Sequence, residues 1–181
     1  QRTGIVHRLD KDTSGVIITA RNYQALVFLQ NQFKLHKTRK IYIAILKGSP
    51  PQKKGCIESR LIRDPKNRKR FISTENIERG KHAKTAWHVL QSWGAYSLVL
   101  FKLYTGRTHQ IRVHAKQLGC PILGDPIYGK KDSIFTSATL MLHAKSLTIT
   151  LPVTHKKYKF TAPLPKRFKK VLKKLRDFNN V

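Results

Sequence analysis

The sequence predicts an α+β protein with a mixed, largely antiparallel sheet and a few flanking helices. Short apolar runs typical of strands occur along most of the chain, whereas helical spacing of apolar residues is restricted to a few segments. Hydrophobic residues make up 40% of the 181 residues, which is enough for a hydrophobic core. We therefore expect a single domain over residues 1–181.

The first part of the chain predicts two short strands, a helix and a longer strand. The runs "IVHRL" (residues 5–9) and "VIITA" (residues 16–20) are apolar and β-branched, as in buried strands. Asn22 is the predicted N-cap of a helix that carries its apolar residues at helical spacing. The run "KIYIAIL" (residues 40–46) then predicts a strand.

The middle and the end of the chain add further strands and two helices. A helix is expected within residues 106–119, ending at Gly119. The C-terminal residues 165–178 predict an amphipathic basic helix whose apolar stripe packs on the body of the protein. The predicted strands are "CIESRLI" and "RFIST" around a basic turn, "KTAWHVLQSW" and "YSLVLFKLY" separated by Gly94 and Ala95, "LMLHAKSLTITL", and "KKYKFTA".

The charge of the chain indicates a polyanionic partner. There are 37 Lys and Arg against 9 Asp and Glu, which gives a formal net charge of +28. Such a charge attracts polyanions, and we expect nucleic acid as the partner in preference to an anionic membrane surface. No apolar run approaches the roughly 18 residues of a spanning helix. Cys56 and Cys120 lie far apart without a C-x-x-C pair, so we expect reduced thiols in a cytoplasmic protein, with no disulfide and no zinc site.

Motifs that bind phosphates, nucleotide cofactors or catalytic metals are absent from the sequence. The eight His residues are scattered without the paired spacing of metal ligands. We therefore expect no cofactor and no metal.

The segment "HRLDKDTSG" holds two of the few carboxylates in the chain. Asp12, together with Ser14 and Gly15, fits ordinary turn chemistry. Asp10 differs because it stands where the predicted strand meets the loop, and a side chain at that junction can face a cleft. It follows Arg8 by two positions, so both side chains point to one face of an extended backbone. An ionised carboxylate facing an RNA site is best explained if it reacts.

Two other segments carry side chains suited to RNA. Arg107, His109 and Arg112 are crowded within "GRTHQIRVH", and planar donors of this kind bind phosphate or a carboxylate. Asp125, in "GDPIYG", fits a structural role in a turn. Tyr42 lies in a predicted strand, where a tyrosine either belongs to the core or stacks on an extruded base.

Taken in this order, the motifs resemble those of the RluA family of RNA pseudouridine synthases. "HRLDKDTSG" is similar to the catalytic motif of the family, "RKIYIAILKG" to its tyrosine motif, "GRTHQIRVHAKQLGCPILGDPIYG" to its long third motif, and "LMLHAKSLTIT" to its late strand. The resemblance extends over nearly the whole chain. The family carries more chain before the catalytic motif, so we expect residues 1–181 to be a catalytic domain that lacks its N-terminal part.

The resemblance implies a pseudouridine synthase fold with a central RNA-binding cleft and assigns roles to several residues. Asp10 is implied to be the catalytic carboxylate, Tyr42 to stack on the target base and Arg112 to pair with Asp10. Leu142 is implied to form part of the pocket wall, and Arg8 to fill the space of the flipped base. To these we add Arg107 and His109 as RNA-binding residues, from the cluster described above.

The expected function is the isomerisation of uridine to pseudouridine in RNA by a monomer. Large-subunit (23S) ribosomal RNA is the favoured substrate and tRNA the alternative. Asp10 could act as a nucleophile on the base or the ribose, or as a base that removes a sugar proton, and the sequence does not separate these. Two other classes stay open: a non-catalytic RNA-binding or ribosome-assembly factor, and, less favoured, a base-removing enzyme.

Overall fold

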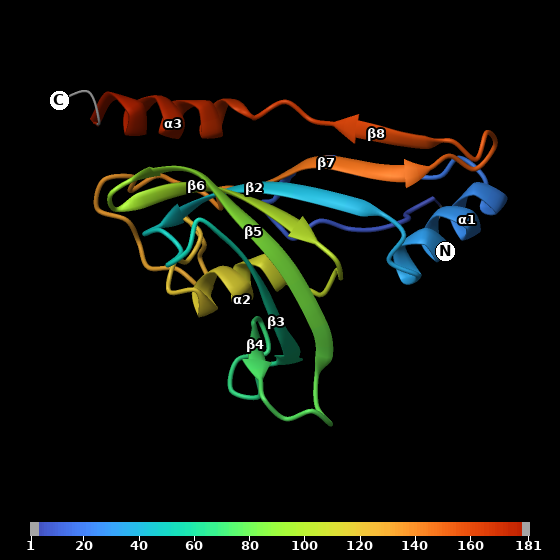
Figure 1. Cartoon of the computed structure of the whole chain (residues 1–181), viewed down its shortest axis with the longest axis horizontal. Helices are drawn as coiled ribbons and strands as arrows, with labels where there is room; N and C mark the ends of the chain where they lie inside the picture. Colours follow the sequence, from blue (N-terminus) through green and yellow to red (C-terminus); the bar gives the residue numbers. More distant parts are fainter. Residues whose placement is uncertain (1–3, 179–181) are drawn as a thin grey trace.

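A computed structural model of the protein describes residues 4–178. Figure 1 shows a long curved sheet with helices at its ends and on its faces. In chain order the elements are β1 (Ser14–Gly15), α1 (Tyr23–Lys34), β2 (Arg39–Lys47), β3 (Lys54–Arg63), β4 (Phe71–Thr74), β5 (Lys81–Trp93), β6 (Tyr96–Leu103), α2 (Gln110–Gln117), β7 (Leu142–Thr150), β8 (Lys157–Thr161) and α3 (Lys166–Phe178).

One eight-stranded sheet organises the described part of the chain. Its order is β1-β7-β2-β6-β5-β3-β4, with β8 paired to β7. β1 runs parallel to β7, and the other strand pairs are antiparallel. The prediction of an α+β fold with a mixed, largely antiparallel sheet is therefore confirmed.

The long hairpin of β5 and β6 follows from alternating burial. Thr85, Trp87 and Val89 point into the protein while their neighbours in β5 are more exposed, which is the pattern of a strand with one core face. The strands are joined through Gly94, whose φ of 59° lies in the left-handed region that glycine adopts without a steric cost. The two strands predicted on either side of this glycine are confirmed.

The central strand β2 is buried on both faces. Four consecutive residues, 43–46, are buried because α2 and α3 belong to the same core cluster as β2 and β6. In Figure 1, α3 lies above these strands and α2 below them. The apolar stripe predicted for the C-terminal helix is confirmed: Phe168, Val171, Leu172 and Leu175 are all buried.

Helix α1 begins as predicted. The Asn22 side chain accepts a hydrogen bond from the Ala25 amide at 2.8 Å, which satisfies one of the free N–H groups of the first turn. Leu29 is buried and Leu26 and Phe33 pack beside it on β7 residues in a second, smaller core cluster.

The two short strands predicted before and after the Asp10 loop are wrong. Residues 5–9 and 16–20 run side by side but share only an isolated bridge between Ile5 and Thr19. The Ile18 amide donates instead to the Nε2 atom of His7 at 3.0 Å, so a side chain takes the place of a ladder partner. Ile17 is 54% exposed, whereas Val16, Ile18 and Ala20 are partly buried against the smaller core cluster, so the run is not the fully buried strand that was predicted.

Residues 4–178 contain no helix with both the length and the apolar character needed to cross a bilayer. In the same part of the chain, no three His, Cys, Asp or Glu residues are grouped as metal ligands would be. Cys56 is exposed and Cys120 is buried, and both are free thiols.

Candidate active site

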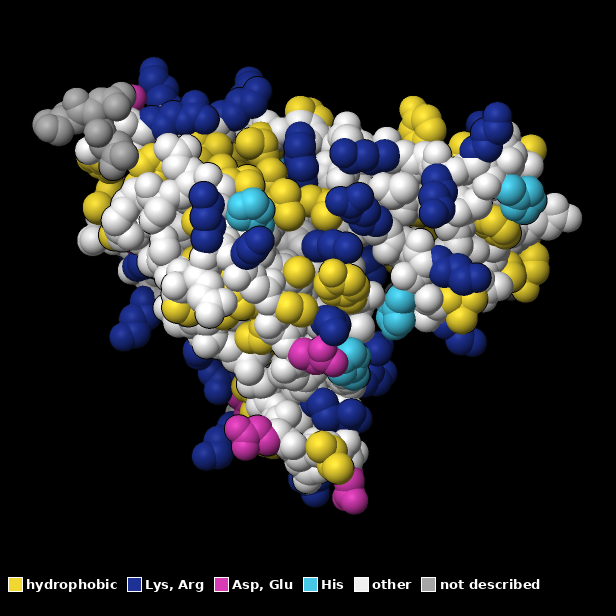
Figure 2. Space-filling view, viewed as in Figure 1, with side chains coloured by type: hydrophobic (Ala, Val, Ile, Leu, Met, Phe, Trp, Pro, Cys, Tyr) yellow, Lys and Arg dark blue, Asp and Glu magenta, His cyan; other side chains and the backbone are white. Residues whose placement is uncertain are grey.

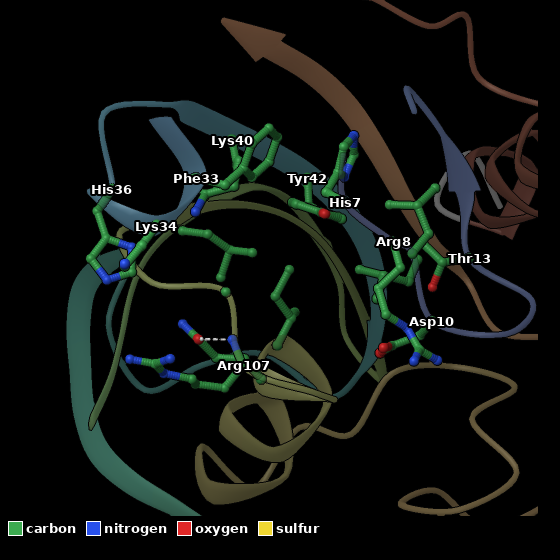
Figure 3. A pocket seen from close by; sticks show the side chains of 16 residues that line it. His7, Arg8, Asp10, Thr13, Phe33, Lys34, His36, Lys40, Tyr42 and Arg107 are labelled. Carbon is green, nitrogen blue, oxygen red and sulfur yellow. Dashed lines mark hydrogen bonds between the residues drawn. The ribbon is translucent and has the colours of Figure 1, made fainter. Parts of the chain in front are cut away.

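A cavity of about 430 Å³ opens where the Asp10 loop, the end of α1, β2 and the turn before α2 meet. Figure 3 shows Arg8 and Asp10 at one end of this cavity and His36 and Arg107 at the other. The full lining is His7, Arg8, Leu9, Asp10, Thr13, Phe33, Lys34, His36, Lys40, Tyr42, Leu103, Gly106, Arg107, Gln110, Ile111 and Leu142. Segments that lie far apart in sequence thus build one site.

Asp10 lies in the wall of the cavity with a loosely held carboxylate. Its side chain is 20% exposed, and its Oδ2 atom is 3.9 Å from Nη1 of Arg112, which is too long for a strong hydrogen bond. The backbone of the residue is better fixed, since its carbonyl accepts the Thr13 amide at 3.0 Å. The backbone therefore fixes where Asp10 lies, while its carboxylate is not held by a short hydrogen bond to Arg112.

Arg112, which was expected to pair with Asp10, is paired mainly with Asp125. Its Nε and Nη2 atoms each donate to one Asp125 oxygen at 2.7 Å, in the bidentate geometry that suits guanidinium and carboxylate. Burial opposes the charge on Arg112, but the carboxylates of Asp125 and Asp10 outweigh it and raise the pKa of Arg112. The guanidinium also lies 5.1 Å from the centre of the Tyr128 ring.

Asp125 combines the predicted turn role with this ion pair. Its Oδ1 atom accepts the amides of Ile127 at 2.9 Å and Tyr128 at 3.0 Å, which stabilises the turn as expected. Its side chain is fully buried. A carboxylate with so many short contacts holds Arg112 in place beneath Asp10 and has no capacity left for chemistry.

Tyr42 and Leu142 lie in the cavity wall, as the resemblance implied. They come from neighbouring strands, and the β2–β7 register shifts between Ile41 and Tyr42. Bulges of this kind redirect a side chain next to a site. Burial and the nearby Asp10 charge raise the pKa of Tyr42, so its hydroxyl stays protonated. Leu142 is 3% exposed and supplies an apolar surface.

The three residues predicted to bind RNA are placed differently. Arg8 is exposed and Arg107 half-buried, and both line the cavity. The Nε atom of Arg107 donates to the His82 carbonyl at 2.9 Å, which fixes the stem of its side chain. His109 is outside the lining: it precedes α2 with a φ of 56° and its Nδ1 atom is 3.0 Å from the Tyr128 hydroxyl.

Lys40 is a cavity residue that the sequence reasoning missed. It is 8% exposed, and the only hydrogen bond of its Nζ atom found within residues 4–178 is a long one of 3.4 Å to the Thr105 carbonyl. Burial and the Arg107 charge lower the pKa of Lys40 to about 8. The sequence could have indicated this, because Lys40 lies two residues before Tyr42 in one strand and alternate residues of a strand share a face.

Two further residues, which were not among the predicted site residues, shape the site without offering a reactive group. His7 stacks on Phe33 with ring centres 4.6 Å apart, and burial lowers its pKa to about 4, so it is neutral at pH 7. Gln110 is buried, and its Oε1 atom accepts the Arg107 amide at 2.9 Å, which holds the turn that presents Arg107.

Comparison with known proteins gives a consistent answer. The sequence model described as RNA pseudouridylate synthase matches residues 1–117. The chain belongs to this family. The recognition of an RluA-type pseudouridine synthase from the sequence motifs is thereby confirmed.

Among similar proteins of this family, the ribosomal large subunit pseudouridine synthase D of Borreliella burgdorferi is 51% identical over 167 residues, which are 92% of this chain and 50% of that protein. An uncharacterized RNA pseudouridine synthase of Chloroflexus aurantiacus is 44% identical over 176 residues, 97% of this chain and 54% of that protein. The chain thus spans about half the length of the curated relatives it matches.

Solved structures support the pseudouridine synthase fold. Human RNA pseudouridylate synthase domain containing 4 superposes with a TM-score of 0.80 at 26% identity, covering 96% of this chain and 76% of that one. Human RNA pseudouridylate synthase domain containing 1 gives a TM-score of 0.76 at 28% identity, covering 96% and 80%. The expected fold is confirmed over nearly the whole chain.

Proposed function

We propose that the chain is a catalytic domain that isomerises uridine to pseudouridine in RNA, with Asp10 as the catalytic carboxylate. The observation that carries this assignment is the contrast around Arg112: Asp125 is fully bonded to the guanidinium, whereas Asp10 faces the cavity with its oxygens uncommitted. Membership in the family supports the reaction class.

In the reaction, the bond between C1′ of the ribose and N1 of the uracil breaks, the base turns, and a bond from C1′ to C5 forms. No atom is gained or lost, so the chain needs only to hold, orient and move a proton. The carboxylate of Asp10 serves either as a nucleophile on the base or ribose or as a base toward a sugar proton. Arg112 places a cation 3.9 Å from this carboxylate, at the wall of the cavity.

The target uridine must leave its stack before it can reach Asp10, at a free-energy cost of roughly a few kcal/mol. Tyr42 and Leu142 form a wall against which the extruded base packs. Arg8 at one end, and Lys40 and Arg107 toward the other, supply cations for the flanking phosphates. Figure 2 shows Lys and Arg side chains over the visible face and few acidic ones, which favours RNA binding along the surface.

We propose large-subunit ribosomal RNA as the substrate, and the cytoplasm as the location where such an RNA is met. The proposal is supported by the relative from Borreliella burgdorferi, whose name is ribosomal large subunit pseudouridine synthase D, and by the net charge of +28. Transfer RNA is the alternative substrate of the same chemistry.

The test is complementation with mapping of pseudouridine. Total RNA from a strain that lacks the gene is compared after restoring wild type, Asp10→Asn or Asp12→Asn. Asp12 is the matched control because it is exposed, lies two residues away in the same loop and has a φ of 70°, which Asn also tolerates.

We expect wild type and Asp12→Asn to restore the same sites in 23S RNA. Asp10→Asn should lower the rate by at least about 10³-fold and restore none. Full restoration by Asp10→Asn would show that Asp10 is not the catalytic carboxylate. The absence of any gene-dependent site would favour a non-catalytic RNA-binding protein, and sites in tRNA alone would replace the proposed substrate.

A further inference from the structure

The loop that carries Asp10 is held by an arginine from the last helix of the chain. The Nη2 atom of Arg167 donates to the Asp12 carbonyl at 2.8 Å and to the Ser14 hydroxyl at 3.0 Å. Its Nη1 atom donates to the Thr139 hydroxyl at 3.3 Å. One guanidinium thus joins the loop to two segments from the end of the chain.

The next residue of α3 reinforces this link through a histidine. The Ser14 hydroxyl is 2.9 Å from Nδ1 of His143, which is 2% exposed on β7. The His143 ring centre is 5.9 Å from that of Phe168. Arg167 therefore acts on the loop directly, and Phe168 acts on it through His143.

The helix that presents Arg167 is firmly attached. Phe168, Val171, Leu172 and Leu175 belong to the main core cluster, together with residues of β2, β5 and β6. The guanidinium accordingly projects from a fixed backbone, and its rigid planar donors fix the groups they contact.

Apart from Arg167, the contacts that hold the loop lie at residues 14–16 and within the turn from Asp10 to Thr13. Asp12 has a φ of 70°, a left-handed conformation that side chains other than glycine disfavour. Only Ser14 and Gly15 pair with the sheet. Gly15 approaches β7 so closely that an added Cβ would lie 2.2 Å from the Ala144 carbonyl oxygen. Without Arg167, the strained turn at Asp12 would lose its external support.

The bonding of Arg167 is unusual for a cation. Within residues 4–178, no carboxylate lies within salt-bridge distance of its guanidinium, and its Nε atom is buried without a hydrogen-bond partner. A half-buried guanidinium is bonded here to a carbonyl and two hydroxyls rather than to a carboxylate. This arrangement makes sense if the loop conformation is what the residue maintains.

We propose that Arg167 is a positioning residue for Asp10. It fixes residues 12 and 14, and the Thr13 amide transmits that position to the Asp10 carbonyl, so that the carboxylate stays in the cavity wall. This inference rests on the proposed function, because it gives Asp10 a reaction to be positioned for. Arg167 acts through the loop and not on the RNA.

The kinetic test compares Arg167→Ala, Arg167→Lys and the control Lys170→Ala under single turnover at saturating RNA. Lys170→Ala removes the same charge from the exposed face of the same helix. Arg167→Ala should lower the rate about 10- to 100-fold, because small displacements of a reacting group have effects of this size. Arg167→Lys, which keeps the charge but has one donor group in place of the fork, should be intermediate, and Lys170→Ala should keep the wild-type rate.

A rate that is unchanged in Arg167→Ala, with only the Kd for RNA raised, would overturn the proposal in favour of a phosphate contact. Hydrogen exchange of peptides covering residues 10–15 gives a readout that needs no activity. Exchange there should be faster in Arg167→Ala than in wild type and Lys170→Ala, and equal exchange would also overturn the proposal. If wild type itself forms no pseudouridine, the proposed function fails, and the exchange result still decides whether Arg167 holds the loop.

Discussion

Asp10 and Asp125 lie on the same guanidinium of Arg112, at 3.9 Å and 2.7 Å respectively. Asp125 is fully buried, takes two short hydrogen bonds from Arg112 and two from backbone amides. Asp10 is partly exposed and takes no short bond from the guanidinium. The Asp125 carboxylate is fully hydrogen-bonded and serves the fold, while the Asp10 carboxylate lies near the same cation without a short bond to it. Two carboxylates near one arginine thus differ in role: Asp125 stabilises the fold, and Asp10 is left to react.

Removing the shared arginine should break both roles and have the largest effect. Arg112→Ala leaves Asp125 buried without its charge partner, which should lower the free energy of unfolding by about 3–5 kcal/mol. Turnover should be lost as well, because Asp10 loses its neighbouring cation. Urea unfolding and a pseudouridine assay measure the two effects.

A double variant separates the two effects of Arg112. In Arg112→Ala/Asp125→Asn the uncompensated buried charge is removed, so stability should recover in part while turnover stays low. If stability does not recover, the destabilisation of Arg112→Ala does not arise from Asp125. If turnover recovers, Asp10 does not need the guanidinium.

Asp132 is, like Asp125, a carboxylate whose oxygens are occupied by hydrogen bonds, and it extends the comparison with Asp10. It is bonded to Lys47 and Tyr96, each at 2.9 Å, and to two backbone amides. Burial raises its pKa, but the hydrogen bonds from Lys47, the Phe135 amide and Tyr96 outweigh this and lower the pKa to about 2. A lowered pKa means that the ionised form stabilises the fold above the ordinary pKa of 3.8, and that this contribution is lost as the pH falls toward 2.

Asp132→Asn should therefore be less stable than wild type by about 2 kcal/mol at pH 6 and by about half of that at pH 3. Urea unfolding of both proteins at these two pH values measures the difference. A difference that is the same at both would show that the carboxylate charge contributes nothing.

Lys40 is the cationic counterpart of Asp10, and its effect should be the smallest. It faces the cavity with a pKa of about 8, so it is charged at pH 7 and mostly neutral at pH 9. The affinity of wild type for RNA should fall between these pH values by about tenfold or less, as expected for one phosphate contact. Lys40→Arg stays charged and should lose less affinity over the same range. Parallel curves in a Kd titration at constant salt would exclude Lys40 as the titrating group.

Regular elements were predictable from sequence where local pattern and tertiary packing agree. The predicted strand at β5 shows the alternating burial of a strand with one core face. The predicted helix at α1 has the Asn22 cap and the helical spacing of apolar residues on which the prediction was based. The strand predicted at residues 16–20 is wrong because β-branched residues indicate a strand whether or not a partner strand is available. Its Ile18 amide is bonded to His7, a contact that no local pattern encodes.

The candidate site was predictable in its members but not in its connections. Asp10, Tyr42 and Leu142 line one cavity, as the motif resemblance implied. The turn chemistry of Asp125 was visible in "GDPIYG", but its bond to Arg112 depends on how α2 packs against that turn. Lys40 was missed because a lysine in a strand normally reaches solvent, and only the packing of distant segments around the cavity makes it a buried cation.

The contacts around the Asp10 loop also set an order for assembly during synthesis. Ser14 is bonded to a residue 129 positions later, and Asp12 to one 155 positions later. A ribosome makes the chain from its N-terminus, so the loop is translated long before the strand and helix that hold it. The hairpin of β5 and β6 can form while translation continues, but the carboxylate loop is complete only once α3 has left the exit tunnel. The Asp10 segment is thus synthesised before the elements that give it its working shape.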